Sequence, residues 1–193
     1  MRVIGTVGMP GSGKGVFAEA ARDRGIPVVT MGDVVRAETE ARGLDPAEHH
    51  GEVARSLREE DGPLAIAERS LPTVREHLEE HDTVVVDGLR SGDEAERFEE
   101  AFGDAFLLVA ITAPAEIRAE RLDLRGRDDT ESESIEERDE RELGFGMGEA
   151  IDRADLTVGN AGTLGAFRER AAAVLDGGTG TDDVTAVEGV ERP

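Results

Sequence analysis

The residues with the clearest chemical potential are Gly8-Met-Pro-Gly-Ser-Gly-Lys-Gly15, near the start of the 193-residue chain. Glycines let a backbone curl until successive N–H groups point inward, where they bind phosphate oxygens. A lysine at the end of such a loop supplies a mobile positive charge for a transferring phosphoryl group. The spacing therefore predicts a phosphate-binding loop. Its expected nucleotide contacts are Gly8, Pro10, Gly11, Ser12, Gly13, Lys14 and Gly15.

This loop lies between elements of the kind that such a site requires. Residues 2–7 form a β-branched run typical of a buried strand, and a helix is expected from Lys14 to about Arg24. Further strands are expected at 28–30, 83–86, 106–111 and 156–158, and further helices at 31–42, 46–61, 64–80, 114–124 and 163–175. Short strands alternating with helices predict an α/β fold with a five-stranded, mostly parallel sheet flanked by helices.

One domain is expected over residues 1–175, a length that buries a core without disulfides or structural metal. Residues 43–82 supply two helices whose length suits a cap over an acceptor. After Asp176 the apolar periodicity is lost, so a disordered acidic tail is predicted over 176–193.

The composition restricts the partners. The chain has 44 acidic and 22 basic residues, a formal net charge of −22, which disfavours nucleic acid and anionic membranes. Dense carboxylates spread over helix faces resemble a haloadapted surface, with an ordinary acidic protein as the alternative. Lys14 is the only lysine, which suggests that arginine cannot replace it there. The chain has no cysteine and no apolar run long enough to span a bilayer, so a cytoplasmic location is expected.

Position 15 departs from the common form of the loop. The Ser or Thr that ligates magnesium in most P-loop GTPases and motor ATPases is Gly15 here. The form Gly-x-Pro-Gly-Ser-Gly-Lys-Gly instead resembles adenylate kinase and its relatives, in which magnesium is held largely through water. This resemblance implies a P-loop NTPase fold with ATP and Mg²⁺ as cofactors.

Two later segments extend the resemblance to nucleoside monophosphate kinases. Thr30-Met-Gly-Asp-Val-Val-Arg36 is similar to their Thr-Gly-Asp-x-x-Arg segment, with Met31 intervening. Asp87-Gly-Leu-Arg90 is similar to their Asp-Gly-x-x-Arg element, one residue shorter. The resemblance implies an acceptor site of Thr30, Asp33, Arg36 and Arg90, with hydrated magnesium held by Asp33 and Asp87. A solvated helix charge is the alternative for Arg36.

A third cluster is rich in arginine. Arg121-Leu-Asp-Leu-Arg125-Gly-Arg127, with Arg138 and Arg141 following on an expected helix, is similar to the mobile lid of these kinases. The resemblance implies a lid over 121–143 whose arginines close over the phosphates and stabilise charge in the transition state. Salt bridges to neighbours such as Glu137 and Glu142 are the alternative.

Two other features complete the site predictions. The stretch from Ala154 to Thr163 resembles the Asp-x-x-x-x-Asn-x-Gly segment near the end of dephospho-CoA kinases, which implies that Asn160 and Gly162 lie in a loop against adenine, where backbone groups contact the base. A plain strand-to-helix turn is the alternative. His49-His50 is assigned to a surface loop and not to a metal site, since adjacent histidines point to different sides.

Residues 1–175 as a whole look most like an archaeal adenylate-kinase-like family with dephospho-CoA-kinase-like features. This resemblance implies an ATP-dependent phosphotransferase whose small-molecule acceptor is a nucleoside monophosphate or dephospho-CoA. The alternative is an ATPase switch of the same fold that acts on a protein partner and phosphorylates no small molecule.

Overall fold

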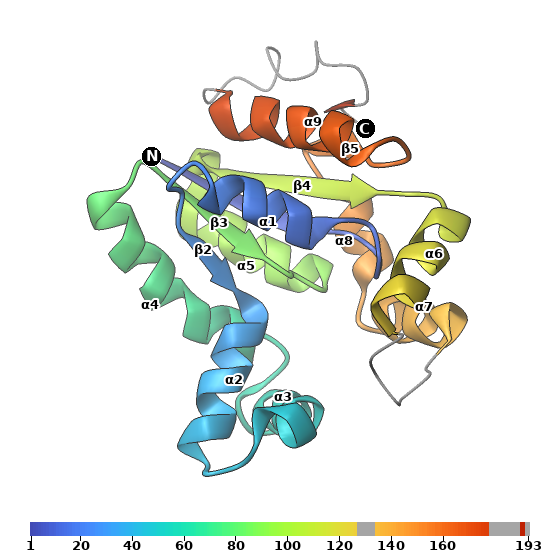
Figure 1. Ribbon diagram of the computed structural model, residues 1–193. Coiled ribbons are helices and arrows are strands. Elements are labelled where there is room, and N and C mark those ends of the chain that lie inside the picture. The colour runs from blue at the N-terminus through green and yellow to red at the C-terminus, as the bar shows by residue number, and fades with distance from the viewer. Residues whose placement is uncertain (127–133, 178–189, 192–193) are drawn as a thin grey trace.

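The computed structural model describes residues 1–126, 134–177 and 190–191. Its centre is a sheet with the strand order β2-β3-β1-β4-β5-β6 (Figure 1). The strands are β1 (Arg2–Val7), β2 (Val28–Thr30), β3 (Thr83–Asp87), β4 (Phe106–Thr112), β5 (Leu156–Gly159) and β6 (Val190–Glu191). The first five pair in parallel, and β6 pairs antiparallel with β5. The predicted α/β class with five parallel strands is therefore confirmed.

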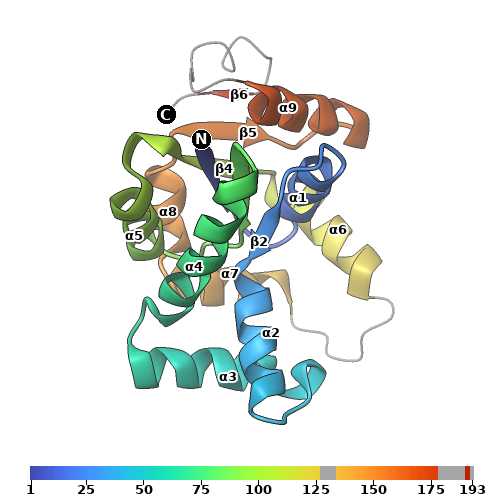
Figure 2. The ribbon, with the colours of Figure 1, turned by 90° about the vertical axis from the view of Figure 1, so that its left-hand side faces the viewer.

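Helices cover both faces of this sheet. They are α1 (Lys14–Arg22), α2 (Met31–Ala41), α3 (Pro46–Asp61), α4 (Ala65–Glu80), α5 (Gly92–Phe102), α6 (Ala115–Gly126), α7 (Ile135–Gly144), α8 (Met147–Asp152) and α9 (Leu164–Asp176), with a 3₁₀ turn at Gly103–Ala105. Helices α1 and α9 lie on one face, and α4, α5 and α8 lie on the other (Figure 2). Helices α2 and α3 project beyond the end of β2.

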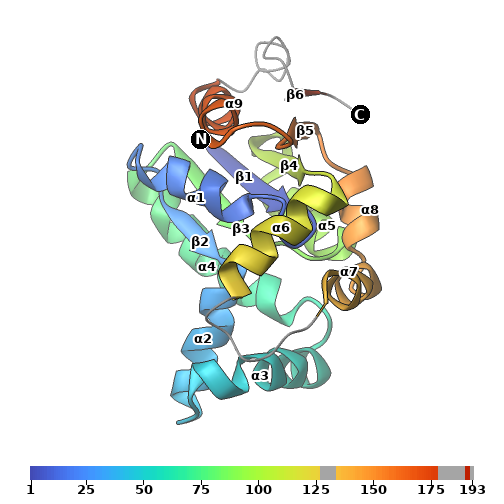
Figure 3. The same ribbon diagram turned by 45° about the vertical axis from the view of Figure 1, so that its right-hand side comes forward.

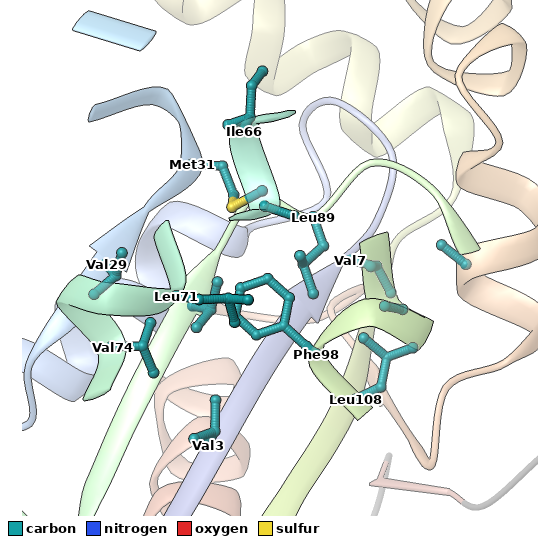
Figure 4. Packing of buried hydrophobic residues seen from close by; sticks show 14 of the residues in the cluster. Val3, Val7, Val29, Met31, Ile66, Leu71, Val74, Leu89, Phe98 and Leu108 are labelled. Carbon is teal, nitrogen blue, oxygen red and sulfur yellow. The ribbon is translucent and has the colours of Figure 1, made fainter. Parts of the chain in front are cut away.

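The alternation of side chains along each strand builds two cores. In β3, Val85 packs with the α1 and α9 side, whereas Val84 and Val86 pack on the opposite side. The core on the side of α4, α5 and α8 is centred on Phe98 and also contains Leu71 from α4 (Figure 4). Because the strands are buried on both faces, their sequences are nearly continuous apolar runs.

The C-terminal region differs from its prediction. Asp176 ends α9, and Val190–Glu191 form β6, where a tail without regular structure was expected. Residues 178–189 and 192–193 of that predicted tail lie outside the described residues. Within the described part of the chain, no helix combines the length and apolar character needed to cross a membrane.

Helix α8 was not predicted. It has only six residues, it contains Gly148, and it begins after Gly146, whose φ is 96°. These features give a weak helical signal, so the helix depends on tertiary packing of Met147 and Ala150, both buried.

Candidate functional site

The predicted phosphate loop connects β1 to α1, and its glycines have the backbone that such a loop requires. Gly8, Gly11 and Gly13 have φ values of 149°, 78° and 115°. A Cβ atom at Gly8 would lie 2.3 Å from the carbonyl oxygen of Ile111, and one at Gly13 would lie 2.3 Å from Nδ2 of Asn160. Only glycine fits these positions without displacing the neighbouring chain.

Two side chains of the loop, Ser12 and Lys14, have polar groups suited to contact an anion. The Ser12 hydroxyl is buried and has no hydrogen-bond partner among the residues that the structure describes, so it fits a ligand that supplies one. The Lys14 ammonium group donates a hydrogen bond to the Gly8 carbonyl oxygen. Burial lowers the pKa of Lys14, and the negative charges of Asp87 and Glu142 oppose this shift. A bound phosphate would relieve the cost of burying this cation.

The two remaining loop residues of the prediction are also at this turn. Pro10 presents its carbonyl oxygen to Nη1 of Arg118 at 3.1 Å. Gly15 lies in the first turn of α1, and a Cβ there would meet no atom within 4 Å. The position therefore has room for the usual serine or threonine, but this chain lacks the magnesium-binding hydroxyl there.

The side chains of Asn160 and Arg121 form hydrogen bonds that hold the backbone of the loop. The Asn160 side chain is buried and donates from Nδ2 to the Ser12 carbonyl oxygen at 2.7 Å. Arg121 donates to the Asn160 carbonyl oxygen at 2.9 Å and to the Gly11 carbonyl oxygen at 3.3 Å. Gly162 is exposed in the same segment. Both side chains thus brace the phosphate loop, and the roles that the resemblance implies, Asn160 beside adenine and Arg121 in a lid, stay predictions.

Asp87 ends β3 beside the loop. It pairs in register with Thr6 of β1 and with Thr30 of β2, and the Thr6 hydroxyl donates to Asp87 Oδ1 at 2.7 Å. No group of three or more His, Asp or Glu side chains suited to a metal occurs among the residues that the structure covers. Asp87 offers one carboxylate beside the loop, and one or two carboxylates with water completing the shell is a usual ligand set for magnesium.

A cavity of about 430 Å³ opens between α2, α3 and α7. All three helices lie together, beyond one end of the sheet (Figure 3). Four arginines line the cavity, namely Arg55, Arg58, Arg90 and Arg141. Glu94 is the only carboxylate among the described lining residues. Glu142, which does not line the cavity, lies 3.5 Å from Arg90 and 3.9 Å from Arg141 and offsets part of this positive charge. In a chain with a net charge of −22, the positive charge that remains suits an anion.

Two of these arginines are held in place by their neighbours. The Arg58 and Arg90 guanidinium carbons lie 5.5 Å and 6.0 Å from the centroid of the Phe145 ring. Arg58 also lies 3.8 Å from the Glu94 carboxylate, and Arg90 lies 3.5 Å from the Glu142 carboxylate. These contacts limit the conformations of both guanidinium groups, which lowers the entropy cost of binding a ligand.

The Glu94 carboxylate is buried at the edge of this cavity. Its Oε2 accepts a hydrogen bond from the Arg90 backbone N–H at 2.8 Å. Burial raises the pKa of Glu94, while this hydrogen bond and the charge of Arg58 oppose the shift. Glu94 thus fixes both the Arg90 backbone and the Arg58 side chain.

The predicted acceptor residues are not all brought together. Arg90 lines the cavity, but Asp33 and Arg36 lie outside it and form an ion pair with each other, with about half of each side chain exposed. Thr30 and Asp33 line a second groove of about 480 Å³ beside β2. The phase of α2 explains this result, because Met31 and Val35 face the cavity and Asp33 and Arg36 do not. Arg36 matches the alternative of a solvated helix charge.

The predicted lid arginines lie on two helices, Arg121 on α6 and the last two on α7, and Arg141 lies 3.9 Å from the Glu142 carboxylate, as the salt-bridge alternative has it. Arg138 and Arg141 lie three residues apart on α7, and Arg141 lines the cavity. The side chain of Arg125 and the whole of Arg127 lie outside the described residues. His50 lies in α3 and lines the cavity, although a surface loop was expected.

Sequence reasoning missed Arg55, Arg58, Glu94, Arg118 and Phe145. The Arg55-x-x-Arg58 spacing on an expected helix was an available signal, since residues three apart share a face. Glu94 gave no signal, because one glutamate is inconspicuous among 44 acidic residues.

Comparison with known proteins shows the family of the chain. A family model described as an AAA domain matches residues 7–136. A UPF0200 protein of Halobacterium salinarum is 54% identical over 170 residues, which cover 88% of this chain and 90% of that protein. A UPF0200 protein of Methanothrix thermoacetophila is 50% identical over 182 residues, covering 91% of this chain and 97% of that protein.

Solved structures support the fold at lower identity. TT1252 from Thermus thermophilus has a TM-score of 0.62 and 22% identity, over 93% of this chain and 98% of its own. A gluconokinase from Sinorhizobium meliloti has a TM-score of 0.57 and 17% identity, over 91% of each chain. Shikimate kinase from Acinetobacter baumannii, solved with shikimate, has a TM-score of 0.55 and 16% identity, over 91% of this chain and 92% of its own. With its P-loop kinase-like fold, AAA domain match and close archaeal relatives, the chain belongs to the UPF0200 family.

Proposed function

We propose that this protein is an ATP-dependent phosphotransferase that moves the γ-phosphoryl group onto a small anionic acceptor, with a nucleoside monophosphate or dephospho-CoA as the favoured class. The observation that carries the proposal is the arginine-lined cavity of about 430 Å³, whose lining residue Arg90 follows β3 just as the phosphate loop follows the neighbouring parallel strand β1. A donor loop alone would suit any nucleotide-binding protein. A second site for an anion beside it is what phosphoryl transfer between two bound molecules requires.

Each part of the site has a role in this proposal. Bound ATP with magnesium supplies the phosphoryl group. The loop N–H groups and the Ser12 hydroxyl hold phosphate oxygens, and Lys14 exchanges its contact with Gly8 for one with the transferring group. Asp87 would hold hydrated magnesium through its water ligands.

The acceptor side uses fixed positive charge. Arg58 and Arg90, held by Phe145, bind and orient the acceptor anion. Arg141 lies at the cavity on α7, where it stabilises the charge that develops during transfer. No strong general base is needed, because positioning and electrostatic stabilisation supply most of the catalysis in phosphoryl transfer.

The cavity also favours a kinase over the alternative of an ATPase switch. A switch that acts on a protein partner needs no enclosed site for a small anion. Two of the structural relatives are kinases whose names specify small-molecule acceptors, shikimate and gluconate, which supports a small acceptor here. Hydroxy acids of this kind therefore belong in the test as competing acceptors.

Product analysis tests the proposal. The protein would be incubated in molar KCl with magnesium, ATP and one of AMP, CMP, dephospho-CoA, shikimate or gluconate, and the phosphorus products would be resolved by ³¹P NMR. We expect ADP and a phosphorylated acceptor with one of the nucleotide-like compounds. ADP and free phosphate in every reaction would contradict the kinase assignment and support the switch, whereas phosphorylation of a hydroxy acid would overturn the acceptor class.

A matched pair of variants connects any activity to the cavity. Arg58→Gln removes a guanidinium group that lines the cavity, and Arg36→Gln removes one that lies outside it. We expect Arg58→Gln to raise the acceptor KM by about tenfold or more, as loss of a charge-assisted hydrogen bond does. Arg36→Gln should leave that KM within about twofold, since surface ion pairs contribute little.

A further inference from the structure

Arg118 of α6 joins the phosphate loop to α7. Its Nη1 atom donates to the Pro10 carbonyl oxygen at 3.1 Å. Its two terminal nitrogens also donate to the two carboxylate oxygens of Asp139 on α7, each at 2.7 Å. The backbone of the same residue lies against the loop, because a Cβ atom at Gly11 would be 2.8 Å from the Arg118 carbonyl oxygen. One residue thus contacts two consecutive loop positions and a second helix.

This ion pair is largely withdrawn from water. The Arg118 side chain is 8% exposed and that of Asp139 is 22% exposed. Burying two charges costs desolvation that their attraction only partly repays, and apolar residues of similar size often stabilise a protein equally well. A bidentate pair, however, fixes both distance and orientation between the elements that it joins. The pair therefore serves mainly to fix the position and orientation of α7 relative to the loop.

Helix α7 extends from this ion pair to the acceptor cavity. Glu142, three residues after Asp139, is buried and lies 3.5 Å from Nη1 of Arg90. Arg141 lines the cavity, and Phe145, which holds Arg58 and Arg90, follows the end of the helix. A displacement of α7 would therefore move the side chains that form one wall of the cavity.

We propose that Arg118 and Asp139 are positioning residues that couple the donor loop to the acceptor cavity. When the loop binds a triphosphate, the positions of the Pro10 carbonyl oxygen and of the Gly11 backbone become fixed. Because Arg118 contacts both of them and pairs with Asp139, the position of α7 becomes restricted as well. Loading of the donor site thereby orders the wall formed by Arg141, Glu142 and Phe145. This inference rests on the proposed function, because it assumes that the loop binds ATP.

Coupling of this kind is a difference between two binding states, so it is measured by adding a donor analogue. Amide hydrogen exchange over residues 135–144 would be followed in molar KCl, with and without a non-hydrolysable ATP analogue and magnesium. In the wild-type protein we expect the analogue to slow exchange in α7 by about fivefold or more, within the usual range of coupling between sites. In Asp139→Asn, which keeps the shape of the side chain and removes its charge, the slowing should fall below about twofold.

A second variant and a control make the result specific. Arg118→Lys keeps the positive charge but cannot form the bidentate contact, so it should lose the response of α7 as Asp139→Asn does. The double variant should lose no more than either single variant, since both act through one contact. Arg97→Lys alters the pair with Glu68 between α5 and α4, with side chains 23% and 50% exposed, and should retain the full response.

The outcomes separate this inference from the proposed function. Calorimetry on the same samples would establish whether the analogue binds. If it binds and α7 responds equally in wild type, Asp139→Asn and Arg118→Lys, the coupling role is overturned while nucleotide binding stands. If the analogue binds to none of the folded proteins, the proposed function and this inference both fail. Should Asp139→Asn not fold, as judged by circular dichroism, Arg118→Lys decides the question.

Discussion

At the scale of single residues, two glycines of the phosphate loop differ in whether they tolerate a side chain. Gly13 has a φ of 115° and faces Asn160, whereas Gly15 lies in a helical turn with open space around its Cα. We expect Gly13→Ala to lower the free energy of unfolding by more than about 1 kcal/mol, the cost of a left-handed backbone for a residue with a Cβ. Gly15→Ala should raise it by about 0.5–1 kcal/mol, because alanine is the better helix former. Urea unfolding in molar KCl measures both, and equal effects would contradict this account of the loop.

Glu94 gives a prediction on pH at the same scale. Because burial raises its pKa, the folded protein holds the Glu94 proton more tightly than the unfolded chain does. The contribution of this group to stability is therefore greatest in acid, and it is lost as the pH rises from the ordinary glutamate pKa of about 4.3 through the folded-state value. Glu94→Gln removes this titration but keeps an oxygen acceptor for the Arg90 N–H group.

The test compares the two proteins across that range. The free energy of unfolding of the wild type, minus that of Glu94→Gln, should become more negative as the pH rises above about 4.3. Urea unfolding at a series of pH values measures it, with Glu100→Gln, an exposed residue of the same helix, as the control. A difference that is constant with pH, or that grows more positive, would show that burial does not control this carboxylate.

At the scale of elements, the fold was largely predictable from local sequence. β3 was expected at 83–86 and ends at Asp87, and the helix expected at 46–61 has those bounds. These elements carry strong local signals: an apolar run for the strand, and Pro46 after the Asp45 cap for the helix. The phosphate loop was predictable for the same reason, because its glycines and lysine are contiguous in the chain.

The acceptor site was less predictable, because it depends on how helices are rotated and packed. Arg36 matched a motif by spacing, but the phase of α2 turns it away from the cavity. Arg58 matched no motif, yet α3 brings it to Phe145 from a distant part of the chain. No motif indicated that the Asn160 side chain would bond the Ser12 carbonyl oxygen. Contacts of this kind are set by tertiary packing, which a single sequence records only indirectly.

At the scale of the whole molecule, the net charge of −22 implies a strong dependence on salt. Self-repulsion destabilises the folded state, and screening shortens the reach of that repulsion from about 10 Å at 0.1 M salt to about 3 Å at 1 M. Each 1 kcal/mol of added stability raises the Tm of a protein of this size by roughly 2–4 °C, so the Tm should rise by at least several degrees between these concentrations. Thermal unfolding followed by circular dichroism measures this, and a Tm that stays constant or falls would contradict a haloadapted surface.

The central claim is that residues 8–15 bind a nucleoside triphosphate with Lys14 at its phosphates, and calorimetry tests it most directly. The wild-type protein and Lys14→Met would be titrated with a non-hydrolysable ATP analogue and magnesium in molar KCl. We predict one site per chain in the wild type and binding weaker by about 10- to 100-fold in Lys14→Met, the loss expected for one charge-assisted contact. A folded wild-type protein that takes up no analogue, or a Lys14→Met variant that binds it with unchanged affinity, would contradict the account.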